Sequence, residues 1–540
     1  MHAKIRNPIL RGFNADPSIC RVGRDYYIAT STFEWYPGVQ IHHSTDLANW
    51  TLVKRPLDRA AQLDMRGNPD SGGVWAPCLS HADGLFWLVY TDVKRLEGNF
   101  KDAHNYIVTA PAIEGPWSDP VYVNSSGFDP SLFHDDDGRK WFVNMQWNHI
   151  SHGVGGSPKH PSFDGILLQE YDAKAGELVG PIRNIFPGSP HGLVEAPHLY
   201  KRGGWYYLTT AEGGTGYGHA VTMARSRDIA GPYELHPLVH PITSKDAPDA
   251  PLQRAGHGQI VETPDGEVYH THLTGRPLPD LRRSPLGRET GIQKCEWRDD
   301  GWLYLAHGGQ VPALEVDAPK GSAGSKADRS ISLRHDFTGD MLPLDFQWLR
   351  TPLPERIFTL TGQGLRLFGR ESIGSWFEQA LVARRQEHFV YRAETSLAFD
   401  PDTYQQAAGL VSYYNRHKFH FLAVTRTPKA GRALMIMSCL GDWQDGKLTF
   451  GLDEPVPLPA EGEIGLRADV DGASLRFSYS TGGEWLRVGP ELDQSLISDE
   501  GGRGEHGSFT GAFVGMAAFD TSGRARPADF GYFAYQGTGD

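Results

Sequence analysis

Three acidic side chains recur in short proline-containing motifs of the first half of the chain. Asp16 lies in Asn-Ala-Asp-Pro-Ser, Asp129 in Phe-Asp-Pro-Ser-Leu and Glu195 in Val-Glu-Ala-Pro-His. An Asp before a Pro is common in ordinary turns, so neither Asp is a strong signal alone. Glu195 is less ordinary, because it interrupts an apolar run typical of a buried strand. A carboxylate there is costly unless it is paired or has a chemical task.

Carboxyl groups that are brought together in one cleft can divide the work of acid and base catalysis. Repulsion between like charges separates their pKa values, so that one group keeps its proton while another stays ionised. That combination suits cleavage of a glycosidic bond. The alternative is that the three acids hold a structural cation.

The acidic motifs belong to a longer repeat, which indicates how they could meet in space. Each of five segments has a small or acidic residue near Pro or Gly, an apolar strand, a polar turn and an aromatic-rich strand. Their key positions are Asp16, Ala76, Asp129, Glu195 and His257. A period of about 60 residues with about four short strands predicts a five-bladed β-propeller, whose innermost strands converge on one channel. The alternative is a row of unrelated β-hairpins.

A second domain is expected after the repeats end. We place the propeller over residues 1–313, a Gly/Ser/Lys-rich linker over 314–330 and a further domain over 331–540. Alternating strands at 466–470 and 475–479 flank an Asp-Gly turn signal. Many such strands without helices predict an antiparallel, lectin-like β-sandwich, and hence an all-β chain.

Composition and charge exclude some partners. The chain of 540 residues has a formal net charge of −13, which would repel nucleic acid and anionic membranes, although it also simply favours solubility. The four cysteines form no CxxC pair, so neither a zinc site nor a disulfide framework is expected. The N-terminus has no apolar signal region, so we expect a cytoplasmic protein unless a signal was removed. We also expect a homo-oligomer.

The three acidic motifs resemble those of glycoside hydrolase family 43, and they occur in the same order. Residues 31–41, Ser-Thr-Phe-Glu-Trp-Tyr-Pro-Gly-Val-Gln-Ile, and 286–290, Leu-Gly-Arg-Glu-Thr, resemble its β-xylosidase branch. That branch also carries a C-terminal sandwich, so the resemblance covers almost the whole chain. No departure from the family pattern is seen at the three acids.

The resemblance implies an inverting, exo-acting hydrolase of xylan degradation. It would release xylose from the non-reducing end of β-1,4-xylo-oligosaccharides, and no cofactor would be required. The close alternative is an α-L-arabinofuranosidase or a dual xylosidase/arabinofuranosidase, because the two sugars present similar hydroxyl groups. A non-catalytic carbohydrate-binding propeller is the alternative of another class, and the three intact acids argue against it.

The resemblance also implies individual roles for the acids. Asp16 would be the general base that activates water, and Glu195 the general acid that protonates the leaving oxygen. Asp129 would orient Glu195 and raise its pKa by charge repulsion. In an inverting enzyme, base and acid stand roughly 6.5–9.5 Å apart, which leaves room for the water.

Aromatic residues could form the walls of a sugar site. Phe33, Trp75 and Trp147 match such positions in the family, and the alternative is that they are core aromatics. Relatives insert an aromatic loop from the sandwich into the pocket, and residues 507–513 are the candidate here because their glycines permit a tight loop. Of the two aromatics in that loop, we favour Phe509 over Phe513.

Two further polar residues are candidates for the site. Arg288 could donate paired hydrogen bonds to sugar hydroxyls, or could form a surface ion pair with Glu289. His257 stands at the fifth repeat position, where it could hold a water or a water-mediated cation, or be a hydrogen-bonded core residue. A structural Ca²⁺ in the propeller channel is the one metal that the resemblance suggests.

Overall fold

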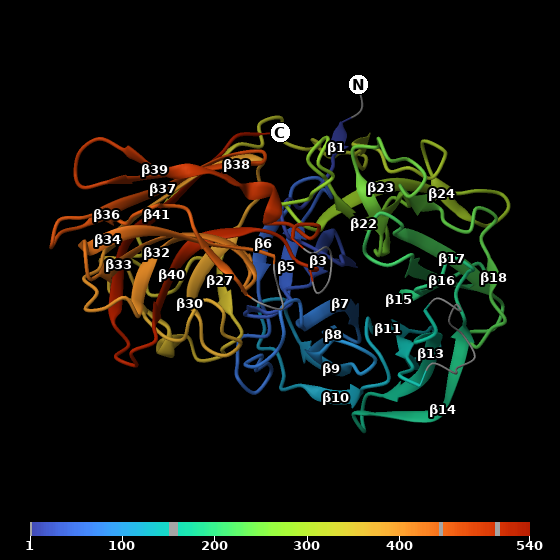
Figure 1. Cartoon of the computed structure of the whole chain (residues 1–540). Coiled ribbons are helices and arrows are strands. Elements are labelled where there is room, and N and C mark those ends of the chain that lie inside the picture. Colours follow the sequence, from blue (N-terminus) through green and yellow to red (C-terminus); the bar gives the residue numbers. More distant parts are fainter. Residues whose placement is uncertain (1–2, 151–159, 442–445, 503–507, 540) are drawn as a thin grey trace.

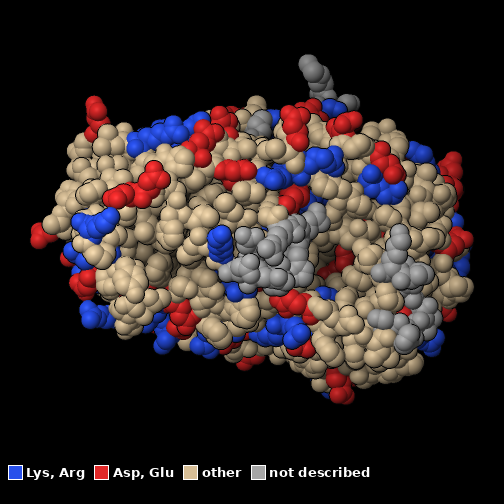
Figure 2. Space-filling model, viewed as in Figure 1, with Lys and Arg blue, Asp and Glu red and all other residues tan. Residues whose placement is uncertain are grey.

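The computed structural model describes residues 3–150, 160–441, 446–502 and 508–539 and shows two β domains side by side (Figure 1). The only helices among these residues are two short 3₁₀ turns, η1 (Pro354–Arg356) and η2 (Gln494–Leu496). In the described part of the chain, no helix has the length and apolar character needed to cross a membrane. Acidic and basic side chains are interspersed over the face seen in Figure 2.

The first domain is a five-bladed propeller, as the repeat predicts. Each blade is an antiparallel sheet that runs outward from its innermost strand. Blade one contains β2 (Ser18–Val22), β3 (Asp25–Thr30), β5 (Gln40–Ser44) and β6 (Thr51–Lys54); blade two contains β7 (Gly73–Ala82), β8 (Leu85–Arg95), β9 (Asp102–Ala110) and β10 (Val121–Asn124); blade three contains β11 (Ser131–His134), β12 (Lys140–Trp147), β13 (Phe163–Asp172) and β14 (Glu177–Phe186).

The last two blades are less regular than the first three. Blade four contains β15 (Glu195–Arg202), β16 (Trp205–Glu212), β17 (Ala220–Ser226), β18 (Glu234–Leu235) and β19 (Ile242–Thr243). In blade five the inner edge is divided between two short strands; the blade contains β20 (Gln253–Gly256), β21 (Ile260–Glu262), β22 (Val268–Gly275), β23 (Glu289–Trp297) and β24 (Leu303–Leu305).

Apolar side chains between neighbouring blades hold the propeller together. Blades two and three share a cluster that includes Cys78, Trp87 and Phe142, and blades four and five share one that includes Met223 and Trp302. All five are buried, and burial of one large apolar side chain stabilises a fold by about 1.5–3 kcal/mol. Shared apolar clusters therefore join these neighbouring blades around the channel.

The second domain is the predicted β-sandwich. One sheet contains β28 (Phe358–Leu360), β29 (Leu365–Phe368), β41 (Pro527–Gly537), β31 (Val390–Ala398), β37 (Ile464–Asp471), β38 (Ser474–Ser480) and β39 (Leu486–Asp493), with β26 (Ile331–His335) paired to β41. The other contains β35 (Leu448–Phe450), β34 (Gly431–Leu440), β33 (Lys418–Thr427), β32 (Gln406–Asn415), β40 (Phe513–Asp520), β30 (Ala380–Arg385) and β27 (Phe346–Leu349), with β36 (Val456–Pro457) paired to β34. The Asp-Gly signal indeed joins β37 to β38, where Gly472 has a φ of 58°.

The propeller contributes a strand to the second domain. β4 (Trp35–Tyr36) leaves blade one and pairs with β27 of the sandwich. The Trp35 ring then stacks on Phe513 of β40 with 3.6 Å between the ring centroids. Within the segment expected to be a linker, β25 (Glu315–Asp317) pairs with β1 (Lys4–Arg6). The domain limits stay a prediction, but the two domains share a continuous sheet.

Candidate active site

A cavity of about 330 Å³ lies at one end of the propeller channel. Its lining includes Asp16, Asp129 and Glu195 from blades one, three and four, and one aromatic side chain, Phe509, from the sandwich. All three acids are buried. The cavity therefore brings together the three carboxyl groups that the sequence places far apart.

Each acid lies at or just before the start of the innermost strand of its blade, and the backbone has an unusual conformation there. Asp16 and Asp129 have φ values of 57° and 52°, in the left-handed region that non-glycine residues rarely adopt. In blade four the left-handed residue is Ala196, and the pairing of β15 with β16 shifts register between Glu195 and His198. Such bulges redirect side chains away from the regular pleat. A conformation of this kind costs on the order of 1–3 kcal/mol and is common at functional sites.

Asp16 is surrounded by groups that stabilise its ionised form. Its carboxylate lies 3.1 Å from Nη1 of Arg288 and 3.4 Å from Nδ1 of His257, and it accepts a 2.6 Å hydrogen bond from the Ser31 hydroxyl. Burial alone would raise its pKa, but Arg288, His257 and Ser31 together hold the pKa of Asp16 well below its usual range. Asp16 is therefore a carboxylate throughout the neutral range.

Glu195 has the opposite electrostatic environment. Burial, followed by the negative charge of Asp16, raises the pKa of Glu195 to about 8, although Arg288 and Lys101 favour the ionised form. Burial, then the charges of Glu195 and Asp16, raises the pKa of Asp129 well above its usual range. Glu195 therefore keeps its proton at neutral pH, beside an ionised Asp16.

Arg288 joins the acid site to the sandwich. Besides contacting Asp16, its Nε donates a 2.8 Å hydrogen bond to the backbone carbonyl of Phe509. The backbone N–H of Phe509 donates in turn to the Ser71 hydroxyl at 3.0 Å. The alternative partner, Glu289, is instead bound by Arg276 at 2.8 Å. Arg288 thus faces the cavity and does not form the surface pair with Glu289.

Some of the aromatic residues predicted to form walls line the cavity, and others do not. Phe33 and Trp75 line the cavity together with Phe509, whose ring centroid lies 6.4 Å and 6.0 Å from theirs. Phe513 is fully buried under Trp35 and lies outside this lining. Trp147 also lies outside it, with its ring centroid 6.3 Å from that of Phe128, so its contact with a sugar stays a prediction. Of the candidate loop, residue 507 lies outside the described residues.

Sequence reasoning missed several residues around the cavity. Lys101 lines it, and burial lowers the pKa of this amine to about 8. Its Nζ lies 4.4 Å from the centroid of Trp147. His219 also lines the cavity, and Ser31 holds Asp16. No motif marks Lys101, because it follows a polar turn and approaches the acids only when blades two and four are assembled.

His257 belongs to the acid site, since its ring contacts Asp16. Ca²⁺ takes six to eight oxygen ligands. The ring of His198 lies 6.1 Å from that of His257, and His219 lines the same cavity. Imidazole nitrogens and one carboxylate already paired with Arg288 do not fit a directly coordinated Ca²⁺. A cation bound to His257 through water stays a prediction.

Comparison with known proteins gives matches over almost the whole chain. The model of glycosyl hydrolases family 43 matches residues 5–303, and that of the β-xylosidase C-terminal concanavalin A-like domain matches 334–536. Xylosidase/arabinosidase 43B of Humicola insolens is 60% identical, covering 99% of this chain and 98% of that protein. The β-xylosidase of Bacillus subtilis is 49% identical, covering 99% of both. The crystal structure of xylan β-1,4-xylosidase from Bacillus halodurans C-125 is 49% identical, with a TM-score of 0.93 over 98% of this chain and 100% of that one.

Proposed function

Because this chain belongs to glycoside hydrolase family 43, we propose that it releases xylose from the non-reducing end of β-1,4-xylo-oligosaccharides and inverts the anomeric centre. One observation carries the proposal. The same cavity contains an ionised carboxylate, Asp16, and a carboxyl group that keeps its proton, Glu195. Inverting hydrolysis needs this pair of protonation states.

In the proposed reaction the two acids act on opposite sides of the scissile bond. Glu195 donates its proton to the glycosidic oxygen as the bond from that oxygen to the anomeric carbon breaks. Asp16 removes a proton from a water whose oxygen forms the new bond to the same carbon. Asp129 orients Glu195, and Arg288 keeps Asp16 ionised. The charge expected from Asp129 comes instead from Asp16, because the pKa of Asp129 is itself raised. One water is consumed, and the two acids have exchanged protonation states before solvent restores them.

The cavity walls support cleavage at a chain end. A volume of about 330 Å³ is small for an oligosaccharide, and Phe33, Trp75 and Phe509 supply apolar surface for one sugar ring. Phe509 comes from the sandwich, so the second domain acts as a wall that stops a longer chain from passing through. A wall at this position favours exo-cleavage.

Hydrolysis of xylobiose followed by proton NMR tests the proposal. We expect turnover, with α-xylose as the first product, because water attacks the face opposite the leaving group. Binding of xylobiose without turnover would show a carbohydrate-binding protein instead. β-Xylose as the first product would rule out inversion.

Arabinofuranosidase activity is the second candidate, because the relative from Humicola insolens is named a xylosidase/arabinosidase. The ratio of kcat/KM for an aryl β-xyloside to that for an aryl α-L-arabinofuranoside decides between the two. A ratio well above one supports the xylosidase, and a ratio well below one supports the arabinofuranosidase.

We further propose that the protein acts in the cytoplasm, since polymeric xylan cannot enter a cell and short oligosaccharides can. We also propose that it is a homo-oligomer. Cell fractionation should find the activity with the soluble interior, and activity confined to the medium would contradict this. Light scattering should give a multiple of the 59.7 kDa chain mass. A value equal to one chain would contradict the oligomer.

The pH profile should have an alkaline limb set by Glu195. The general acid must be protonated, so kcat/KM for xylobiose should be constant below its pKa of about 8 and fall tenfold per pH unit above it. Asp16 must be ionised, and its lowered pKa places the acid limb below the range normal for Asp. An aryl xyloside whose leaving group needs no protonation should lose the alkaline limb. A limb near the ordinary Glu value of about 4.3 would contradict the assignment.

Replacing Phe509 with Ala should lower kcat/KM for xylobiose about tenfold, because one apolar wall of the cavity is lost. The backbone hydrogen bonds of residue 509 with Arg288 and Ser71 do not involve its side chain and should survive. The matched control is Phe450→Ala at an exposed position of the sandwich, which should leave kcat/KM unchanged. Equal losses in both variants would contradict a wall contributed by Phe509.

A further inference from the structure

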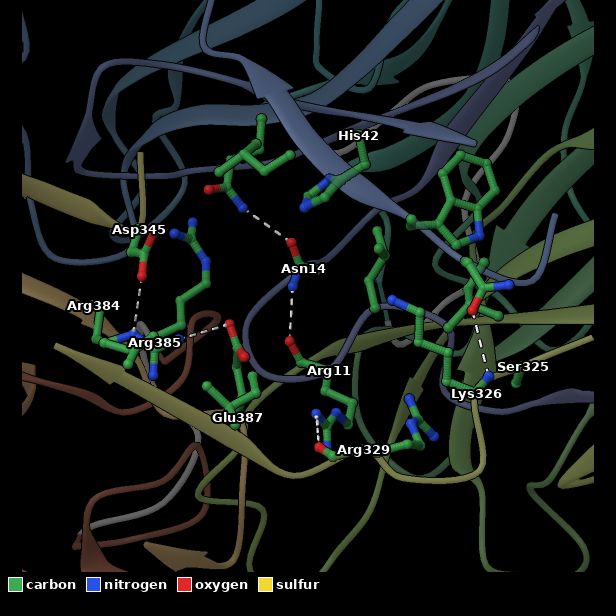
Figure 3. Close-up of a pocket in the computed structure, with 18 of the residues that line it drawn as sticks. Arg11, Asn14, His42, Ser325, Lys326, Arg329, Asp345, Arg384, Arg385 and Glu387 are labelled. Atoms are coloured by element: carbon green, nitrogen blue, oxygen red, sulfur yellow. Dashed lines mark hydrogen bonds and ion pairs between the residues drawn. The ribbon is translucent and has the colours of Figure 1, made fainter. Parts of the chain in front are cut away.

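A second cavity, of about 460 Å³, lies where the propeller meets the sandwich (Figure 3). In the close-up, Arg384, Arg385 and Glu387 of the sandwich lie on the left and Lys326 lies on the right, with Asn14 and Arg11 between them. Arg329 lies below Arg11, and His42 lies at the top of the view. We call this the interdomain cavity. It does not share lining residues with the acid site.

The interdomain cavity is basic although the chain as a whole is acidic. Its six cationic lining residues are Arg11, Arg55, Lys326, Arg329, Arg384 and Arg385, and its three acidic ones are Asp328, Asp345 and Glu387. The formal net charge of the chain is −13. A local excess of positive charge on an acidic protein, gathered in a concave site, is the pattern expected for anion binding.

Two of these arginines are buried against neutral groups. Arg385 is 5% exposed, and it donates to the carbonyl of Phe13 at 2.6 Å and to the side chain of Gln347 at 2.5 Å. Arg55 is also 5% exposed and donates to Gln40 and to the carbonyl of Phe346. In the described part of the chain, neither guanidinium has a carboxylate as a hydrogen-bond partner. Buried charge of this kind is costly until a counter-charge approaches.

Several donors around the cavity have no acceptor among the described residues. They are Nη1 of Arg11, Nε and Nη1 of Arg384 and Nη2 of Arg385. The three acidic residues have other partners. Glu387 lies 3.3 Å from Arg384, Asp345 accepts from His335 at 3.1 Å, and Asp328 accepts from the backbone N–H of Ser330 at 2.8 Å. Burial, and then the charge of Arg55, also holds the pKa of Arg385 well below its usual range, which reflects the same lack of counter-charge.

We propose that the interdomain cavity binds a small oxyanion of the phosphate class, either free phosphate or a phosphate carried on a small sugar. Guanidinium groups match phosphate oxygens with paired hydrogen bonds. The arginines approach from the N-terminal segment, blade one and the sandwich, so they suit a tetrahedral anion better than a planar carboxylate. The exposed Lys326 leaves a route from solvent.

Titration calorimetry at constant ionic strength tests the proposal without any measurement of hydrolysis. Inorganic phosphate and glucose 6-phosphate are the two probes, and we expect one site per chain. Tighter binding of the first indicates a site for free phosphate, and tighter binding of the second indicates a sugar phosphate. No heat from either probe up to about 10 mM would overturn the proposal.

Arg11→Gln should weaken binding about tenfold, because one charge-assisted hydrogen bond to the anion is lost. The control is Arg21→Gln, because Arg21 also donates to a backbone carbonyl, that of Gly23 at 2.8 Å, but lies far outside the cavity lining. It should bind as the parent does. Equal weakening in both variants would overturn the site.

If Arg11→Gln fails to fold, Lys326→Gln and Lys429→Gln form a second matched pair. Both lysines are exposed, but only Lys326 lines the cavity. Weaker phosphate binding in Lys326→Gln alone supports the site. Unchanged binding in Lys326→Gln would overturn it.

Discussion

Replacing Glu195 with Gln should lower kcat on xylobiose by about 10²–10⁴-fold, the range that one general acid contributes. Gln has nearly the shape of Glu but cannot give a proton to the leaving xylose, which is a poor leaving group as an alkoxide. A dinitrophenyl xyloside departs without protonation, so its hydrolysis should fall far less. The two substrates, compared at one pH in steady-state assays, therefore separate loss of the acid from loss of the fold.

Glu212→Gln is the matched control for Glu195→Gln. Glu212 is a buried carboxyl group of the same blade whose pKa is also raised, first by burial, but it lies outside the cavity lining and accepts hydrogen bonds from Ser189. We expect near-parental rates on both substrates. If Glu195→Gln slowed the two substrates equally, the role of general acid would have to be withdrawn.

Replacing Asp16 with Asn should lower kcat by about 10²–10⁴-fold on xylobiose and on the dinitrophenyl xyloside alike. Activation of water is needed whatever the leaving group, so no choice of leaving group should restore the rate. The distinction from Glu195→Gln is therefore in the pattern across substrates, which steady-state assays measure directly.

The control for Asp16→Asn is Asp135→Asn. Asp135 is buried and contacts a cation, Lys201, at 2.6 Å, but it lies outside the cavity lining. It should keep parental kcat even if it melts at a lower temperature. A dinitrophenyl xyloside that Asp16→Asn still hydrolysed at the parental rate would show that Asp16 is not the base.

Most of the correct predictions from the sequence came from the repeat of five units. Five units of similar length predict five blades, and the position of the acid within its unit predicts that Asp16, Asp129 and Glu195 share one end of the channel. The sandwich follows from alternating strands and the turn between β37 and β38. These are local patterns, and the structure confirms the two architectures they predict.

Contacts between distant segments could not be predicted in the same way. Lys101 has no motif, and it approaches Glu195 only after blades two and four assemble. β4 belongs by sequence to blade one, yet it completes a sheet of the sandwich. The choice between Glu289 and Asp16 as partner of Arg288 likewise depends on where Arg276 lies. Local patterns contain no information about these pairings.

The two contacts of Arg288 have a consequence for how such a chain can be divided or recombined. One side chain holds the carboxylate of Asp16 and the backbone of Phe509, so the proton affinity of the base depends on a peptide group of the other domain. Exchanging the C-terminal domain for another module would therefore change ionisation within the propeller as well as the shape of the pocket. The two domains therefore form one functional unit, although each has its own fold.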